Sequence, residues 1–247
     1  LDDKSKSVPV AILDKDAGLY LHWSKDSQTV HWTLGDQYYS KKLKDKFSFL
    51  EEKAEEENEL REKGIAIGLT AKVDQPKGII AFTGARIITM EGDEVIENGT
   101  IVIEGSNILA VGEKDKVSIP KNAMVYGMKD KTIMPGMVDA HAHIGAFRDG
   151  LTVQQNWQLY ANLAFGVTTS HDPSANSETV FTLSEMIKNG SLVGPRIFST
   201  GFILYGADGD FKAVINKLED AKSSLRRTKA LGATSVKSYN QPRRDQR

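Results

Sequence analysis

The 247-residue chain contains no cysteine. That absence excludes disulfide bonds, cysteine-ligated zinc and a thiol nucleophile, although it leaves the cellular compartment open. No apolar run approaches the roughly 20 residues that a helix needs to cross a bilayer. The first residues, Leu1 to Lys4, do not have the pattern of a signal peptide. We expect both ends of the chain to be cuts within a longer protein.

The chain also lacks an excess of charge of either sign, since 32 basic and 33 acidic residues give a formal net charge of −1. Bulk electrostatics therefore favour neither nucleic acid nor an anionic membrane as a partner. Histidine is scarce, with five in the chain, and two of the five are separated by a single residue at His141 and His143.

These two histidines end an apolar, strand-like run, Ile133-Met134-Pro135-Gly136-Met137-Val138-Asp139-Ala140-His141-Ala142-His143. Side chains alternate between the two faces of a strand, so both imidazoles point the same way. Two neutral imidazoles held side by side can bind one divalent metal ion. The simpler alternative is a pair of polar residues that cap a strand. The spacing behind Pro135-Gly136 favours metal ligation.

The sequence MPGMVDAHAHIG resembles the first barrel strand of the amidohydrolase superfamily, in which Pro-Gly, a hydrophobic residue, Asp and two histidines follow one another. The resemblance implies an α/β protein with a (β/α)8 TIM-like barrel. It also implies hydrolysis by a water that one or two divalent metal ions activate, with zinc as the expected metal. The sequences GVTT, GPRIFSTG and VKSYN favour the branch that contains imidazolonepropionase-like and Xaa-Pro dipeptidase-like enzymes.

Residues 1–40 read as short strands, and LYLHWSKDSQTVHWTLGDQYYS resembles one blade of a TolB-like β-propeller, with a Trp-Ser-x-Asp turn between two strands. A single blade cannot bury both of its faces, so we interpret this region as a remnant of a larger propeller. The expected strands are Val8–Leu13, Leu19–Trp23, Thr29–Leu34 and Gln37–Tyr39. Four aromatic residues alternate along them, and we expect structural roles for all four: His22, Trp23, His31 and Trp32.

Residues 41–64 form a charged linker, whose apolar residues at helical spacing predict a solvated helix. Residues 65–132 are rich in strands and resemble the small β-sandwich that many amidohydrolases place before the barrel. The sequence Glu104-Gly105-Ser106-Asn107 predicts a hairpin turn. The expected strands are Ile79–Phe82, Arg86–Met90, Thr100–Glu104, Asn107–Val111 and Met124–Tyr126.

From residue 133 to residue 247 the pattern changes to strand, loop and helix, which predicts a parallel sheet. The expected strands are Ile133–Ala140, Val167–Ser170, Arg196–Thr200 and Ser235–Tyr239. The expected helices are one around Val153 to Ala164, one over Glu178–Asn189 with Ser177 as its N-cap, and one from about Phe211 to Leu231. A full barrel takes roughly 250 residues, so the 111 residues from Met137 to Arg247 predict its first half.

Active sites of such barrels lie at the carboxyl ends of the strands. The first strand ends in His141 and His143, and the fourth carries Lys237 and Tyr239. An unpaired ammonium is costly to bury in an apolar strand. In the amidohydrolase superfamily a lysine at the end of strand four is often carbamylated and bridges two metal ions, so we assign Lys237 as the third metal ligand. The alternative is a lysine that reaches solvent or pairs with Asp172.

Other residues at the strand ends are expected to orient the ligands or to contact substrate. Asp139 precedes the histidine pair, and His171 and Asp172 end the second strand. Tyr239 and Arg243 follow Lys237, and an arginine there could clamp a carboxylate or lie in a solvated loop. No catalytic acid or base can be assigned, because the superfamily takes its remaining histidines and its aspartate from later strands.

We therefore interpret the protein as a metal-dependent hydrolase that cleaves C–N bonds in a small molecule or peptide, and we expect this chain alone to be incomplete and inactive. Two alternatives stay open: a non-catalytic amidohydrolase-like scaffold, and a metal-dependent lactonase or phosphoesterase on the same fold. The propeller allows a protein partner, and self-association is also open. The compartment is undetermined, and the propeller fusion favours a periplasmic or extracellular one.

Overall fold

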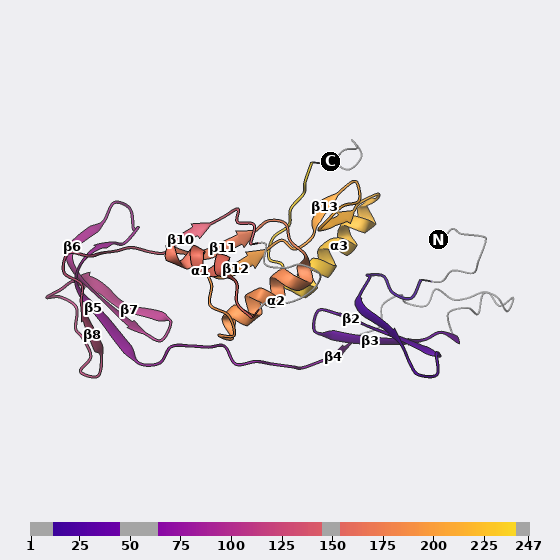
Figure 1. Ribbon diagram of the computed structural model, residues 1–247, viewed down its shortest axis with the longest axis horizontal. Helices are drawn as coiled ribbons and strands as arrows, with labels where there is room; N and C mark the ends of the chain where they lie inside the picture. Colours follow the sequence, from indigo (N-terminus) through magenta and orange to yellow (C-terminus); the bar gives the residue numbers. More distant parts are fainter. Residues whose placement is uncertain (1–11, 45–63, 145–153, 241–247) are drawn as a thin grey trace.

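The computed structural model describes residues 12–44, 64–144 and 154–240, and it contains four β-sheets and three helices in those ranges. The expected strand Val8–Leu13 lies mostly outside the described residues, as do most of the linker over 41–64 and the residues Val153 and Arg243. The elements form an elongated row, with the β5–β8 sheet at one end and the β1–β3 sheet at the other (Figure 1).

The N-terminal sheet is antiparallel, with the strand order β1-β2-β3-β4. β1 (Leu19–Trp23) and β2 (Thr29–Leu34) have the bounds that the sequence predicts, and β3 (Gln37–Lys42) and β4 (Ile65–Ala66) complete the sheet. Strict alternation in β2 buries one face, whose core is Val30, Trp32, Leu34 and Tyr39. The expected turn between β1 and β2 is stabilised by Asp26 Oδ1, which accepts hydrogen bonds from Ser24 Oγ at 2.6 Å and from the Gln28 amide at 3.1 Å.

Residues 79–133 form a five-stranded sheet, in which a meander of three antiparallel strands is flanked by two strands parallel to β5. The expected strands Ile79–Phe82 and Arg86–Met90 are one strand, β5, because the chain stays paired across Gly84. The predicted hairpin turn is present, with Glu104 opposite Asn107. The strands are β5 (Ile79–Ile88), β6 (Val95–Glu104), β7 (Asn107–Glu113), β8 (Met124–Gly127) and β9 (Thr132–Ile133).

The expected strand Ile133–Ala140 is wrong as a single element, because it divides into β9 and β10 (Met137–Asp139), which belong to different sheets. Pro135 lies between them and has no N–H to donate to a ladder. Gly136 lies so close to Thr168 that any side chain would collide with it. The chain passes here from the five-stranded sheet to the parallel sheet.

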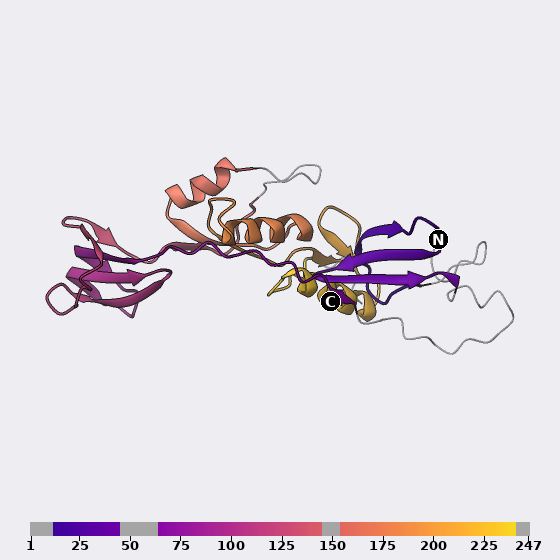
Figure 2. The ribbon, with the colours of Figure 1, turned by 90° about the horizontal axis from the view of Figure 1, so that it is seen from below.

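The parallel sheet has the order β10-β11-β12, and helices pack on one of its faces (Figures 1 and 2). Its core joins residues of the strands and of α1 and α2, among them Leu159, Leu183 and Ile197. The order of strand, helix and strand agrees with the predicted βα repeat. The elements are α1 (Trp157–Ala164), β11 (Val167–Asp172), α2 (Ser177–Lys188) and β12 (Arg196–Ser199).

Two helix starts differ from the sequence prediction. Asn176, not Ser177, is the N-cap of α2, because its side-chain oxygen accepts from the Thr179 amide at 3.2 Å. The helix expected from Phe211 begins at Leu218 as α3 (Leu218–Leu231), because Asp220 Oδ2 accepts from the Asn216 and Lys217 amides and fixes the first turn there. The residues before it form β14 (Lys212–Val214), which pairs with β13 (Ile203–Tyr205).

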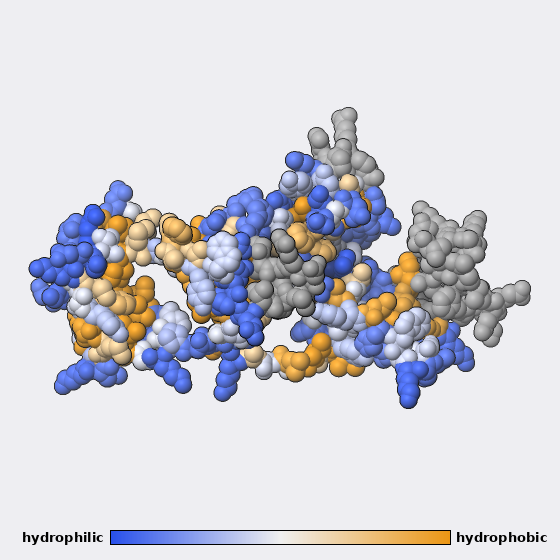
Figure 3. Space-filling view, viewed as in Figure 1, coloured by the Kyte–Doolittle hydropathy of each residue, from blue (hydrophilic) through white to orange (hydrophobic). Residues whose placement is uncertain are grey.

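The expected fourth strand, Ser235–Tyr239, does not form a strand. In the described part of the chain it makes one isolated parallel bridge, from Ser238 to Leu204 of β13, instead of a ladder with β12. Hydrophobic side chains gather at the surface of the β5–β8 sheet, where Ile108, Leu109, Met124 and Val125 are exposed (Figure 3). No helix among the described residues is both long and apolar enough to span a membrane.

Candidate metal centre

His141 and His143 follow β10, and their side chains are exposed whereas the intervening Ala142 and the following Ile144 are buried. The Ala142 amide donates to the His171 carbonyl at 3.0 Å, which ties this segment to the end of β11. The two imidazoles therefore lie on one side of the chain, as the spacing predicts. Their ring centroids are 5.1 Å apart and their planes meet edge to face at 81°.

Asp172 lies behind this pair as a nearly buried carboxylate, with 3% of the residue exposed. Its Oδ1 is 3.4 Å from His143 Nδ1 and accepts from the Ser174 amide at 3.0 Å. Its Oδ2 accepts from the Ile144 amide at 3.1 Å. Because both oxygens are held by backbone groups, Asp172 is itself fixed and lies where it can orient the His143 ring from the Nδ1 side.

Asp139 and His171 take positions beside the centre. Asp139 Oδ1 accepts from the His141 amide at 3.0 Å, so this carboxylate shapes the turn that carries the imidazole. His171 Nε2 lies 2.8 Å from Ser235 Oγ, in the segment that leads to Lys237. His171 thus connects the end of β11 to the lysine segment, a role consistent with orienting the ligands.

The structure brings four of the predicted residues to one cavity of about 370 Å³, namely His141, His143, Lys237 and Tyr239. Lys237 Nζ lies 5.1 Å from the centre of the Tyr239 ring. A second cavity of about 310 Å³ is also lined by the two histidines, together with Asp139 and Trp157 of α1. The histidine pair therefore borders two hollows of the surface.

Sequence reasoning missed three residues of the first cavity, Ser174, Ile203 and Lys212. The fourth, Asp210, lies in the Gly/Asp-rich loop after the third expected strand, which the sequence favours as a flexible loop over a metal site. The sequence predicts a helix at Lys212, but this residue lies in β14, which pairs with β13, so that Lys212 is beside Ile203. The only local signal was the apolar pattern of Phe211, Ala213 and Val214 around it.

The donor set fits part of a divalent metal site. Zinc takes imidazole nitrogens and carboxylate-type oxygens. Within the described ranges no group of three or more His, Asp or Glu side chains is close enough to hold an ion. Among the described residues, two imidazoles are therefore available together at this cavity.

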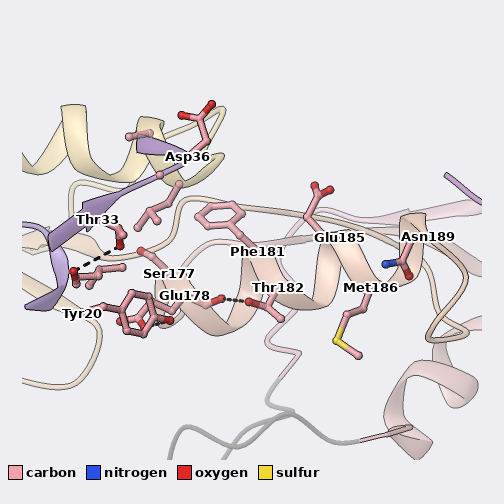
Figure 4. A pocket seen from close by; sticks show the side chains of 14 residues that line it. Tyr20, Thr33, Asp36, Ser177, Glu178, Phe181, Thr182, Glu185, Met186 and Asn189 are labelled. Carbon is pink, nitrogen blue, oxygen red and sulfur yellow. Dashed lines mark hydrogen bonds between the residues drawn. The ribbon is translucent and has the colours of Figure 1, made fainter. Parts of the chain in front are cut away.

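A larger cavity of about 480 Å³ lies elsewhere, between the N-terminal sheet and α2 (Figure 4). Phe181 extends from α2 into this space, and Tyr20 Oη donates to Glu178 Oε2 at 3.2 Å. The negative charge of Glu178 raises the pKa of the Tyr20 hydroxyl above its ordinary value. None of the predicted site residues lines this cavity, which marks the contact between two parts of the fold.

No protein-family model matches the chain. A 5-methylthioadenosine/S-adenosylhomocysteine deaminase of Bacillus cereus (strain 03BB102) is 30% identical over 140 residues, which cover 52% of this chain and 30% of that protein. An imidazolonepropionase of Alkaliphilus metalliredigens (strain QYMF) is 37% identical over 75 residues, which cover 28% of this chain and 18% of that protein. The chain thus spans less than a third of the length of these curated relatives.

Among solved structures, an uncharacterised protein is similar with a TM-score of 0.53 and 26% identity, over 64% of this chain and 45% of that one. A Xaa-Pro dipeptidase with methionine bound in its active site has a TM-score of 0.53 and 21% identity, over 64% of this chain and 46% of that one. An amidohydrolase has a TM-score of 0.51 and 20% identity, which shows a shared fold. These similarities agree with the resemblance of the MPGMVDAHAHIG sequence to the amidohydrolase superfamily.

Proposed function

We propose that the protein that carries this chain is a metal-dependent hydrolase that cleaves C–N bonds in a small molecule or peptide. The observation that supports this most is the convergence of His141, His143 and Lys237 on one cavity from segments almost 100 residues apart in sequence. The sequence relatives named above are a deaminase and an imidazolonepropionase, which agrees with chemistry at C–N bonds.

In this proposal His141 and His143 hold a divalent ion, with zinc as the expected metal, and the carbamate of Lys237 supplies an oxygen ligand. When bound, such an ion lowers the pKa of a water ligand to about 7 and polarises a carbonyl. Asp172 keeps the His143 ring in place through its contact with Nδ1. His171, bonded to Ser235, positions the segment of Lys237.

Carbamylation joins the neutral Lys237 amine to the carbon of CO₂, and the nitrogen loses one proton. The product is an anion, so a half-buried ammonium becomes an oxygen donor. This change also removes the charge that Lys237 would otherwise place beside a cation. Lys237 is one of the three proposed ligands, and its carbamate can be detected directly, so we test the function at this residue.

The experiment supplies ¹³C-labelled bicarbonate and zinc to the purified gene product that contains this chain. We expect a carbamate carbon resonance in the wild type, its loss in Lys237→Ala, and its persistence in the matched control Lys229→Ala on α3. Hydrolysis of a panel of amides, lactones and phosphoesters should show a preference for amides and should fall with Lys237→Ala. A wild type without the resonance, together with full activity in Lys237→Ala, would remove the lysine from the mechanism.

Zinc binding without hydrolysis of any panel member would favour the non-catalytic scaffold. A preference for lactones or phosphoesters would retain the metal centre and replace the proposed reaction. Each outcome therefore separates one of the alternatives that the sequence left open.

A further inference from the structure

Lys212 and Lys237 flank the same residue of β13. Lys212 of β14 is in register with Ile203, and Ser238 is in register with Leu204, which places Lys237 beside Ile203 on the other side. The Ile203 amide donates to the Phe211 carbonyl at 2.9 Å, and the Leu204 amide donates to the Lys237 carbonyl at 2.9 Å. Residues side by side in parallel strands point to the same face. The two lysines and Ile203 accordingly line one wall of the cavity that contains the histidine pair.

Each ammonium lies over a tyrosine ring. Lys212 Nζ is 4.6 Å from the centre of the Tyr205 ring, and Lys237 Nζ is 5.1 Å from that of Tyr239. The two rings contact each other edge to face, with centroids 5.6 Å apart. Cation–π attraction favours side-chain conformers in which the ammonium lies over the ring. The tyrosines therefore favour positions of both ammonium groups on the cavity side of the sheet.

The cavity is lined by more positively charged lysines than negatively charged carboxylates. In the part of the chain that the structure describes, no carboxylate lies within ion-pair distance of Lys212 Nζ, and the cavity contains one carboxylate residue, the exposed Asp210. If Lys237 is carbamylated and binds the metal, it no longer carries an ammonium group, and Lys212 is then the remaining ammonium among the residues that line the cavity. A cavity of about 370 Å³ has the size of a small-molecule site.

We propose that Lys212 binds the carboxylate of an anionic substrate whose scissile bond lies at the histidine pair. This inference rests on the proposed function for the position of the scissile bond, and on the geometry of β13 and β14 for the anion site. One ammonium provides one positive charge and up to three donors, which matches a carboxylate better than a doubly charged phosphate. The flanking Tyr205 ring favours the conformer in which the lysine faces the cavity.

The test compares two probes that differ in one charge, N-acetylglycine and its neutral counterpart N-acetylglycinamide, by isothermal titration calorimetry. The protein is the zinc-loaded gene product that contains this chain. A hydrogen bond to a charged group contributes about 1.5–3 kcal/mol, so the wild type should bind the acid roughly tenfold or more tightly than the amide. Lys212→Met should abolish this preference, and Lys212→Arg should retain most of it.

Lys229→Met, a lysine of α3 that does not line the cavity, is the matched control and should keep the wild-type preference. Lys212→Met should have the same thermal unfolding midpoint as the wild type. This measurement distinguishes a lost binding preference from an unfolded variant. An unchanged preference for the acid in Lys212→Met would overturn the proposal, because the carboxylate would then bind elsewhere, for instance to zinc.

The same titrations on zinc-free protein separate this proposal from the proposed function. A preference for the acid that depends on Lys212 without zinc would support the anion site even if the protein proved unable to bind metal. Absence of any preference in the zinc-free and in the zinc-loaded wild type would overturn the anion site while leaving the metal centre untouched.

Discussion

The N-terminal sheet and the end of β10 each hold a pair of histidines with ring centroids 5.1 Å apart. In the N-terminal sheet His22 and His31 face each other across β1 and β2, and their rings stack at 19°. At the end of β10 the rings of His141 and His143 meet edge to face at 81°. The separation of the rings is the same, so it does not by itself distinguish a packed pair from a metal site.

The two histidine pairs differ in the groups that contact their ring nitrogens. His22 Nδ1 lies 2.8 Å from the Tyr20 carbonyl, and His31 Nδ1 lies 2.7 Å from Tyr38 Oη. The His31 ring also stacks on the Tyr38 ring of β3, so aromatic contacts extend across three strands. This arrangement agrees with the structural role that the sequence predicts for both histidines. His143 has instead a buried carboxylate behind it and a cavity in front of it.

The sharpest test of this comparison removes each pair in turn. We expect His141→Ala combined with His143→Ala to reduce bound metal from about one or two ions per chain to none, because two imidazoles are the first ligands of the site. His22→Ala combined with His31→Ala should leave the metal content unchanged. Elemental analysis of the purified proteins measures both. Equal metal content in the two double variants would mean that the comparison has no bearing on metal binding.

Replacement of the carboxylate behind His143 should have a smaller effect. Asp172→Asn keeps the shape, but its NH₂ group cannot accept a hydrogen bond, so one of the two backbone amide contacts is lost and the hold on Nδ1 is weakened. Changes of this kind typically reduce metal affinity about 10–100-fold. The control is Asp26→Asn in the turn between β1 and β2, where the Ser24 hydroxyl holds the pKa of the carboxyl below its usual value. Competition with a zinc chelator measures the affinity. An affinity that is unchanged in Asp172→Asn would show that Asp172 supports only the fold.

A third test asks whether the two regions are one folded unit. Asp16 is fully buried at the base of the N-terminal sheet, and Arg226 of α3 donates from Nε and Nη2 to its oxygens at 2.7–3.1 Å. Arg226→Met removes the three hydrogen bonds that Nε and Nη2 donate to this buried carboxylate, which should destabilise the contact by about 3 kcal/mol. The neighbouring Arg227→Met should change stability by less than about 0.5 kcal/mol.

Urea unfolding followed by tryptophan fluorescence reports on this contact, since Trp23 and Trp32 lie in the N-terminal sheet. Metal content should stay at the wild-type level in both variants. A parallel loss of metal in Arg226→Met would show that the sheet and the metal centre depend on each other.

The smallest expected effect concerns pH. The Glu178 charge raises the pKa of Tyr20 in the folded protein, so this contact stabilises the fold below the ordinary tyrosine pKa of about 10. The contribution is lost as the pH rises through the higher folded value. Tyr20→Phe should therefore flatten the decline of the unfolding midpoint above pH 10, whereas Tyr160→Phe on α1 should not. An identical alkaline decline in wild type and Tyr20→Phe would exclude this contact as its source.

Local patterns were enough to predict much of the fold. β1 and β2 have the expected bounds because alternation and a side-chain-stabilised turn act over a few residues. The histidine pair was found for the same reason, since both rings lie on one short segment directly after β10. The start of α3 was wrong because the Asp220 cap competes with an otherwise helical pattern in Phe211 to Lys217.

The remaining errors come from contacts between distant segments. The division of Ile133–Ala140 depends on β5 and on Thr168, which lie far away in sequence. The bridge from Ser238 to Leu204 likewise cannot be read from the VKSYN sequence. Lys212 was missed because its position beside Ile203 appears only when β13 and β14 pair.

The segment from β4 to β5 has a consequence for proteolysis. Residues 65–78 are exposed throughout. Beyond the short β3–β4 pairing, backbone hydrogen bonds hold the segment at three points: from the Ile67 amide to the Asp36 carbonyl at 2.8 Å, from the Asp74 amide to the Lys188 carbonyl at 2.9 Å, and from the Gly105 amide to the Gly78 carbonyl at 3.2 Å. Trypsin should therefore cut the folded protein early, after Lys72 or Lys77. The severed N-terminal piece would still be held to α3 by Asp16 and Arg226. A nicked protein would run as one particle on a sizing column and as separate bands only after denaturation.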